Sequence, residues 1–286
     1  MLLNASGCLD ALVAPGVARS LDAFVTKTVT PLPRDGNHPV RIAETDVGML
    51  NSIGLANPGI DRFLGRNLPQ LEKLGVTLWI SVGGFETDDY ADICSRLDDH
   101  AAVSAIELNV SCPNVDAPAE SAAQIVAAAR LATRKPLWAK LSPAVPDVGE
   151  VAKAAQAAGA DGLSLVNTIR GLKLDTRTLR PVLGHGQGGL SGPALKPIAL
   201  AAVATCYRAT AMPIVGMGGI TTGIDALEFV AAGAQHVALG TVLFADPDAA
   251  SRIRIELHAE SAERGWTAYE DAYATAHGEP LSVGTT

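Results

Sequence analysis

The sequence lacks the features that mark membrane, secreted and zinc-binding proteins. No apolar stretch reaches the roughly 20 residues that span a bilayer, and the opening "MLLNASGCLD" is too short for a secretory signal. The four cysteines, Cys8, Cys94, Cys112 and Cys206, lie far apart and show no CxxC spacing, so neither a zinc knuckle nor a disulfide framework is indicated. The sequence therefore predicts a soluble protein of the reducing cytoplasm, without a bound metal.

Basic clusters and a nucleotide-binding glycine motif are also missing. The formal net charge is -8 and Lys and Arg form no stripe, which argues against nucleic acid as the main partner. No GxGxxG turn follows the first apolar run, so a doubly wound dinucleotide-binding sheet is not favoured. Aromatic residues make up only 4%, while Ala, Gly, Val and Leu abound, as is typical of buried parallel strands covered by Ala-rich helices.

Strand-like and helix-like segments alternate along the whole chain. Helical signals include "TDDYADICSRL" with a threonine cap, "ESAAQIVAAARLATR", "VGEVAKAAQAAGA" and "GIDALEFVAAGA", which ends at glycine. Repeated strand–helix units imply right-handed crossovers and a parallel sheet, and eight of them can close into a barrel. We therefore predict a single (β/α)8 TIM barrel domain over residues 1–286. The expected strands are 1–6, 23–28, 77–83, 105–110, 136–142, 162–168, 213–219 and 236–244.

Two connections are longer than packing requires. One runs from Val29 to the helix expected near Ile60, and the other from Thr168 to the helix expected near Pro193. Long irregular connections in a compact domain are commonly lids or binding loops. Both follow strands, so both are predicted on the catalytic face of the barrel.

Polar residues follow several of the expected strands. Ser6, Lys27, Asn109, Lys140 and Asn167 would converge on one mouth, because the carboxyl ends of barrel strands share one face. A buried lysine is costly unless something anionic meets it, and a structural ion pair explains either lysine alone equally well. Two lysines on one rim favour a ligand site.

Cys112 lies in "ELNVSCPN", where Pro113 ends a strand and begins a loop. A lone cysteine is commonly a small buried hydrophobe, so its position at the strand end has to be weighed with its neighbours. Asn51, Asn109, Asn114 and Asn167 surround the same predicted mouth. Each alone is a reasonable turn or capping residue, but together their amides suit a polar ring that carries carbonyl and N–H groups.

Glycines follow the seventh expected strand, where barrels often bind phosphate. Gly218 and Gly219 would let backbone N–H groups approach an anion, and the helix that begins near Thr222 would direct its positive end there. A tight turn explains a double glycine equally well. The position after strand seven favours the phosphate.

The motifs together resemble the class 1 dihydroorotate dehydrogenases, and most closely their NAD-linked B subfamily. The resemblance covers nearly the whole chain, and it implies a (β/α)8 barrel that binds one FMN. Its most specific segments are "ASG" from Ala5, "RIAET", "GMLNSIGLANPG", "ELNVSCPNV", "KLSP", "GADGLSLVNTIRGLKLD", "GGLSGPALKPIAL", "PIVGMGGI" and "LGT".

The resemblance also implies roles for individual residues. Cys112 inherits the role of the base that removes a proton from substrate. The expected FMN contacts are Ser6, Lys27, Thr28, Asn109, Lys140, Val166, Gly192, Gly218, Gly219, Gly240 and Thr241. The expected contacts with dihydroorotate or orotate are Lys27, Asn51, Ser52, Ile53, Gly54, Leu55, Asn109, Asn114, Asn167 and Thr168.

The chemistry implied is one step of de novo pyrimidine (UMP) biosynthesis. A base removes the C5 proton of dihydroorotate while C6 delivers hydride to the flavin, and Lys27 and Lys140 offset the negative charge that develops. Because an ordinary thiol has a pKa of about 8.5, activity is expected to rise with pH. The resemblance further implies a homodimer and a separate electron-transfer subunit with FAD and an iron–sulfur cluster, so that NAD would not bind this chain.

Three departures from the family pattern are visible. The chain starts only a few residues before "ASG" where the family has a β-hairpin, so the barrel floor is expected to be less well closed. After Asn114, "DAPAESAAQ" replaces a longer Lys- and Gly-rich loop, which would expose the site to water and slow the reaction. Ser81 stands where the family has asparagine, which weakens one expected flavin contact.

Other functions stay open at this stage. The same flavin and thiol could serve fumarate as acceptor or another dihydropyrimidine as substrate. The shortened loop and missing hairpin also fit a flavin-binding barrel with reduced or lost activity. Reduction of uridine in tRNA by a related flavin barrel is disfavoured, because the acidic chain shows no RNA-binding patch.

Overall fold

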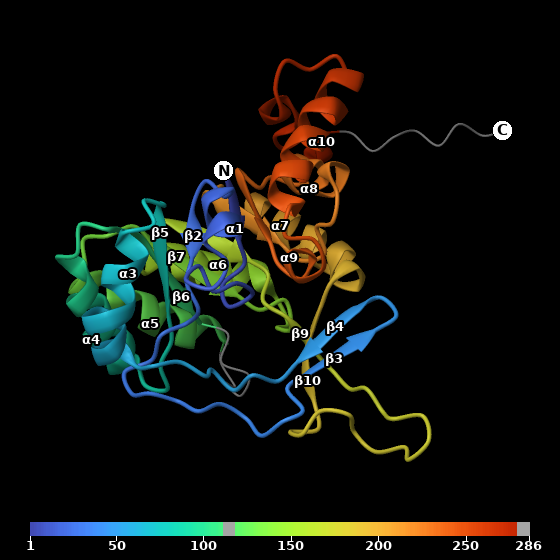
Figure 1. Ribbon diagram of the computed structural model, residues 1–286. Coiled ribbons are helices and arrows are strands. Elements are labelled where there is room, and N and C mark those ends of the chain that lie inside the picture. Colours follow the sequence, from blue (N-terminus) through green and yellow to red (C-terminus); the bar gives the residue numbers. More distant parts are fainter. Residues whose placement is uncertain (111–117, 279–286) are drawn as a thin grey trace.

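The computed structural model describes residues 1–110 and 118–278 and confirms the barrel. All eight expected strands are present and form one parallel sheet in the order β1-β12-β11-β8-β7-β6-β5-β2 (Figure 1). The strands are β1 (Leu2–Asn4), β2 (Phe24–Val25), β5 (Leu78–Val82), β6 (Val103–Asn109), β7 (Leu137–Leu141), β8 (Gly162–Leu165), β11 (Ile214–Met217) and β12 (His236–Leu239).

The two edges of this sheet meet, which closes the barrel. Leu3 forms a parallel bridge with Ala23, between β1 and β2. The buried amide of Asn4 strengthens the join, because its Nδ2 donates to the carbonyl of Val25 and its Oδ1 accepts from the Val25 N–H, both at 2.8 Å.

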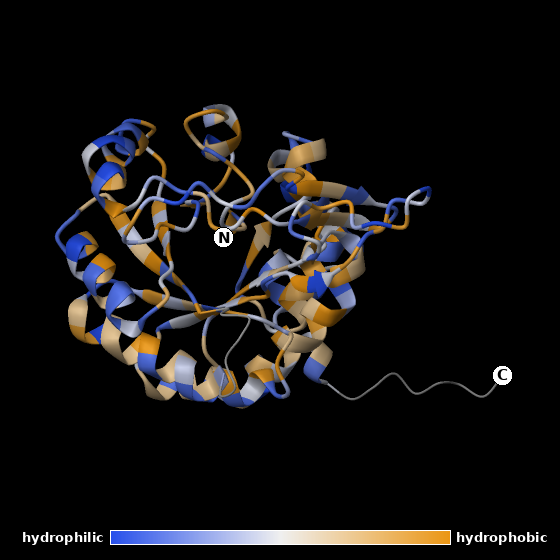
Figure 2. Ribbon diagram, turned by 90° about the horizontal axis from the view of Figure 1, so that it is seen from below, coloured by the Kyte–Doolittle hydropathy of each residue, from blue (hydrophilic) through white to orange (hydrophobic). Residues whose placement is uncertain are grey.

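Helices cover the outside of the barrel, and those expected from the sequence are confirmed. Figure 2 shows hydrophobic residues along the strands, whereas the peripheral helices carry both hydrophobic and hydrophilic residues. The major helices are α4 (Thr87–Asp98), α5 (Pro118–Ala132), α6 (Val148–Ala157), α7 (Lys196–Thr210), α8 (Gly223–Ala231) and α10 (Ala249–Glu263). The shorter elements are α1 (Pro15–Arg19), α2 (Ile60–Arg62), η1 (Phe63–Asn67), α3 (Leu68–Glu72), η2 (Pro193–Leu195), α9 (Val242–Ala245), η3 (Tyr269–Ala272) and η4 (Thr275–His277). The threonine cap expected for α4 is wrong: the N-cap is Glu86, whose N–H donates to Asp89.

Side chains alternate between two environments along each barrel strand. On β6, Ile106 and Leu108 face the core between strands and helices, whereas Ala105 belongs to a separate cluster inside the barrel. Trp79 and Trp138 fill that interior, with ring centroids 4.8 Å apart. The interior below the mouth is therefore a packed core and not a channel.

The two long connections were expected to be irregular, but they contain strands that pair with each other. They form a second, antiparallel sheet in the order β3-β4-β10-β9, beside the barrel in Figure 1. Leu50 of β4 stands opposite Leu190 of β10 and packs with Ala43 and Leu183 in a small core of its own. The strands are β3 (Ile42–Thr45), β4 (Gly48–Asn51), β9 (Ile169–Gly171) and β10 (Gly188–Ser191). Both connections leave carboxyl ends of barrel strands, so they begin at the face where the sequence analysis placed them.

Candidate active site

Four of the predicted residues make direct contacts at the carboxyl ends of the strands. Asn109 ends β6, and its Oδ1 accepts a hydrogen bond of 3.2 Å from Nδ2 of Asn167, which follows β8. Lys140 of β7 donates to the Ser6 hydroxyl beyond β1, at 2.9 Å. Residues from distant parts of the sequence therefore meet at one mouth, as expected.

Lys140 also forms the structural ion pair that the sequence left open as an alternative. Its Nζ lies 3.7 Å from Oε1 of Glu107, and the two side chains are 6% and 1% exposed. Both project into the barrel from neighbouring strands, directly below the mouth. Glu107 was missed by the sequence analysis, although a charged residue inside the apolar run "AIELNV" was a visible signal.

Lys27 is the second cation at the mouth, and no hydrogen bond or ion pair joins its ammonium to another described residue. Burial lowers the pKa of Lys27, and the positive charge of Lys140 lowers it further, while Cys8 partly opposes the change. Gly7 leaves room for the lysine, because a Cβ there would lie 3.0 Å from Nζ and Gly7 has a φ of +81°. A half-buried cation of this kind suits an anionic or carbonyl-bearing ligand.

Backbone N–H groups gather where the phosphate was predicted. Within the described residues, the N–H groups of Gly218, Gly219, Gly240 and Thr241 donate to no backbone acceptor. Gly219 must be glycine, because its φ is +82° and a Cβ would lie 2.8 Å from the carbonyl oxygen of Gly192. Free donors that follow two adjacent strands are typical of a phosphate cradle.

The α8 helix was expected to direct its positive end at that cradle, but N–H groups at this end already have acceptors within the chain. Asp225 accepts hydrogen bonds from the N–H groups of Thr221 and Thr222, at 2.8 and 2.9 Å. Glu256 of α10 accepts from the N–H of Gly223 at 2.7 Å. Carboxylates of the chain itself therefore bind this helix end, and the phosphate site at the loops 218–219 and 240–241 stays a prediction.

Asp225 is expected to be a stability residue and not a ligand residue. Burial alone would raise the pKa of Asp225, but hydrogen bonds from Lys196, Thr221 and Thr222 outweigh it and lower the pKa from 3.8 to about 2. Because this pKa lies below its unfolded value, the stabilisation is present above pH ~4 and is lost as pH falls towards 2. We expect Asp225→Asn to cost about 1–3 kcal/mol at pH 7.

Chemical denaturation at pH 7 and at pH 3 tests this expectation. The deficit of Asp225→Asn should shrink at the lower pH, where the wild type has lost part of the same stabilisation. A deficit that is equal at the two pH values would contradict the assignment.

The segment expected to bind substrate lies where β4 meets β10. Asn51 ends β4, and its Nδ2 donates to the carbonyl of Gly189 at 3.3 Å. Thr168 reaches the same glycine, because a Cβ on Gly189 would lie 2.1 Å from the Thr168 hydroxyl oxygen. Ser52 is buried and its hydroxyl accepts from Asn37. Ile53, Gly54 and Leu55 continue the loop, and the last two have positive φ values of 74° and 56°.

The remaining predicted residues lie around the barrel rim. Thr28 is buried and its hydroxyl is 3.0 Å from that of Ser81, the residue that replaces the family asparagine. Val166 donates its N–H to the carbonyl of Met217. Gly192 approaches Gly48, since a Cβ on Gly192 would lie 2.6 Å from the Gly48 Cα. The roles of these residues in binding FMN stay predictions.

Two predicted residues, Cys112 and Asn114, lie outside the described residues. Cys8, which sequence reasoning did not single out, interacts electrostatically with Lys27 and Lys140. Burial raises the pKa of the Cys8 thiol to about 11, against the opposing effect of Lys140, and its Sγ donates to the carbonyl of Ala5 at 2.9 Å. A thiol in this state is protonated at neutral pH.

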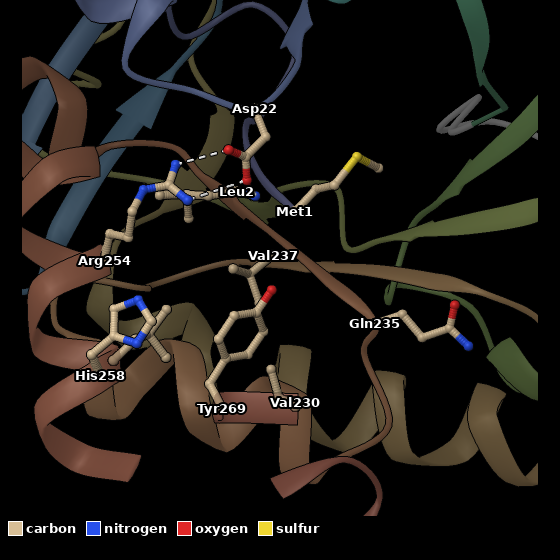
Figure 3. Close-up of a pocket in the computed structure, with 10 residues that line it drawn as sticks. Met1, Leu2, Asp22, Val230, Gln235, Val237, Arg254, His258 and Tyr269 are labelled. Atoms are coloured by element: carbon tan, nitrogen blue, oxygen red, sulfur yellow. Dashed lines mark hydrogen bonds and ion pairs between the residues drawn. The ribbon is translucent and has the colours of Figure 1, made fainter. Parts of the chain in front are cut away.

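A small pocket at the other end of the barrel holds none of the predicted residues. It lies between β1, β12, α8 and α10, where Arg254 pairs with Asp22 at 3.0 Å and Tyr269 lies nearby (Figure 3). Its position at the amino ends of the strands separates it from the mouth. Among the described residues, no helix is long and apolar enough to cross a membrane.

Several known proteins with similar sequences carry the same name. The family model "Dihydroorotate dehydrogenase" matches residues 1–260. The chain is 44% identical over 265 residues to the dihydroorotate dehydrogenase B (NAD(+)) catalytic subunit of Desulforudis audaxviator, covering 90% of this chain and 86% of that one. It is 46% identical over 252 residues to the protein of the same name from Trichlorobacter lovleyi, covering 86% and 83%.

Solved structures show the same fold. The ligand-free dihydroorotate dehydrogenase of Eimeria tenella superimposes with a TM-score of 0.81 and 24% sequence identity, covering 97% of this chain and 89% of that chain. At this identity the likeness concerns the fold alone.

The closed sheet of eight parallel strands, with two lysines and an amide pair at its mouth, places the protein in the (β/α)8 barrel class. With the matches of sequence, the particular family follows: the chain belongs to the dihydroorotate dehydrogenase family, which are oxidoreductases. The resemblance and the fold expected from the sequence are confirmed.

Proposed function

We propose that this chain is the FMN-binding catalytic subunit of an enzyme that oxidises (S)-dihydroorotate to orotate in the synthesis of pyrimidines. The observation that carries the proposal is the mouth itself. Lys27, which pairs with no described residue, and the Asn109–Asn167 amide pair lie on the same barrel face as the loops 218–219 and 240–241. The N–H groups of these loops donate to no backbone acceptor among the described residues. The first two suit a polar ring, and the last suit a phosphate.

The donor set fits FMN in both its parts. The N–H groups of Gly218, Gly219, Gly240 and Thr241 would hold the phosphate. Lys140 and Ser6, joined by a hydrogen bond, together with Lys27 would meet the polar edge of the flavin ring. The other expected contacts are Thr28, Asn109, Val166 and Gly192. FMN, when bound, accepts the hydride that leaves C6 of the substrate.

The amides would read the pyrimidine ring. Asn109 Oδ1 accepts from Asn167, and Asn167 Oδ1 accepts from the Thr168 N–H at 2.8 Å. The amide nitrogen of Asn109 donates to no described residue, so it is available for a ring carbonyl. Asn51, the loop that follows it and Asn114 would complete the contacts with substrate.

Proton removal would be the role of Cys112, which follows Asn109 by three residues in the sequence. The Cys112 thiolate takes the C5 proton, while the ammonium groups of Lys27 and Lys140 offset the negative charge that develops. In this scheme the protein supplies the base, the groups that orient the substrate and the positive charges near the flavin. Oxidation of dihydroorotate by FMN then needs no second residue that gains or loses a proton.

The names of the relatives support a two-subunit enzyme. They describe catalytic subunits of a B-type, NAD(+)-linked enzyme. We propose that electrons leave FMN for a separate subunit that carries FAD and an iron–sulfur cluster, and then pass to NAD. A homodimer of this chain in the cytoplasm completes the proposal.

An anaerobic absorbance titration tests the function. The purified chain should carry FMN, and its long-wavelength flavin band should bleach when dihydroorotate is added. Reoxidation is then followed with fumarate, or with NAD plus the electron-transfer subunit of a relative. Reoxidation by fumarate alone would replace the NAD-linked proposal, and bound flavin that does not bleach would refute the substrate.

A further inference from the structure

Glu107 is a buried acid that has no role in the proposed reaction. It projects into the barrel from β6, two residues before Asn109, and it is 1% exposed. Its Oε1 makes no hydrogen bond with a described residue and lies 3.7 Å from Lys140 Nζ. That separation is within ion-pair range but too long for a direct hydrogen bond.

A second unsatisfied oxygen lies on the other side of Lys140. Ser164 of β8 stands opposite Lys140 of β7 in the sheet register, is fully buried, and has a hydroxyl without a hydrogen-bond partner among the described residues. Buried polar atoms of this kind commonly hold an ordered water. The lysine therefore lies between an acid and a hydroxyl on the two neighbouring strands, in a layer directly below the mouth.

We propose that Glu107 is a positioning residue that acts through Lys140: it holds the buried ammonium in place beneath the cofactor site and sets the reduction potential of bound FMN. This inference rests on the proposed function, because it assigns Lys140 to the flavin. Glu107 itself touches neither substrate nor cofactor in this scheme.

The direction of the effect follows from charge. Two-electron reduction places negative charge on the flavin, so a nearby cation raises the reduction potential and a nearby anion lowers it. The Glu107–Lys140 pair has no net charge, whereas Lys140 alone would favour the reduced flavin more strongly. The low exposure of both side chains means that water screens little of this effect.

The test compares midpoint potentials of bound FMN in four proteins. Glu107→Gln removes the charge with little change of shape. We expect the equilibrium constant for reduction to rise about tenfold, which is a positive shift of about 30 mV for two electrons. Lys140→Gln should shift the potential in the negative direction, and the double variant should return close to the wild-type value. Glu72→Gln on the outer helix α3 makes the same charge change on an exposed residue and should leave the potential unchanged.

A purely structural Glu107 would behave differently. It would lower the unfolding midpoint of Glu107→Gln but leave the FMN potential at the wild-type value, and that result would overturn the inference alone. A purified wild-type chain that binds no FMN would overturn the inference together with the proposed function. Bound FMN that dihydroorotate fails to reduce would refute the proposed substrate and leave the potential comparison intact.

A measurement on the wild-type protein covers the case in which a variant does not fold. The infrared difference spectrum between oxidised and reduced FMN is recorded with and without isotope-labelled glutamate. An ionised glutamate band that shifts on reduction supports the inference, since the carboxylate must respond to the charge of the flavin. Its absence, or a protonated carboxyl band in its place, overturns it.

Discussion

Replacing Cys112 with serine is expected to slow the reduction of bound FMN by dihydroorotate about 10²–10⁴-fold, the usual contribution of a general base. Serine keeps the size of the side chain, but its hydroxyl is a far weaker acid than a thiol and supplies almost no anion at neutral pH. The FMN content should stay at the wild-type level, because the expected phosphate donors are backbone N–H groups of the loops 218–219 and 240–241, which the substitution does not alter. Stopped-flow absorbance of the flavin band under anaerobic conditions gives the rate directly.

The pH profile of the same reaction identifies the base. With an ordinary thiol pKa of about 8.5, the thiolate fraction and therefore the rate should increase with pH up to that region. The three cysteines within the described residues cannot replace Cys112, because burial raises the pKa of Cys8 to about 11 and those of Cys94 and Cys206 to about 12. Cys206→Ala, on the outer helix α7, is the matched control. Equal rates in Cys112→Ser and the wild type would refute the role of Cys112.

The barrel could be predicted from the sequence because each of its signals is local. An apolar run such as "TLWISV" followed by a capped helix specifies one strand–helix unit without reference to the rest of the chain. The second sheet could not be predicted in this way. Its central strands pair Leu50 with Leu190, and β10 is the glycine-rich segment Gly188–Ser191, which has little strand propensity. Pairing across such a separation leaves no pattern within either segment.

The site shows the same division. That Lys27, Asn109, Lys140 and Asn167 belong to one mouth follows from strand order alone. Whether Lys140 has a carboxylate partner depended on which side of β6 Glu107 faces, and the structure shows this ion pair. The capping of α8 depended on Glu256, which lies 33 residues away from Gly223. The sequence therefore could not predict which charged residues of other helices and strands would pair with a given site residue.

Lys27→Met is expected to slow the reduction of FMN and, at the same time, to raise the stability of the FMN-free protein. Loss of the ammonium should slow FMN reduction by about 10²–10³-fold, since preorganised charges at a reacting centre contribute on this scale. The unfolding midpoint of the FMN-free protein should rise, because within the described residues the Lys27 ammonium is half-buried without an acceptor. Lys153→Met is the matched control: that lysine is exposed on α6 and pairs with Glu150, so its loss should change neither quantity appreciably.

The pH dependence of stability gives the sharper form of this prediction. The folded-state pKa of Lys27 lies below its ordinary value of 10.5, so the unfolded chain binds the proton more readily and wild-type stability rises as pH increases between the two values. The advantage of Lys27→Met should therefore be largest at neutral pH and should disappear as pH approaches 10.5. A variant that is less stable than the wild type, yet reduces FMN at the wild-type rate, would show that Lys27 is a structural residue. We expect the opposite result: Lys27→Met should be more stable than the wild type and should reduce FMN more slowly. A buried charge that serves a ligand has this effect, because it destabilises the ligand-free fold and stabilises the ligand-bound state.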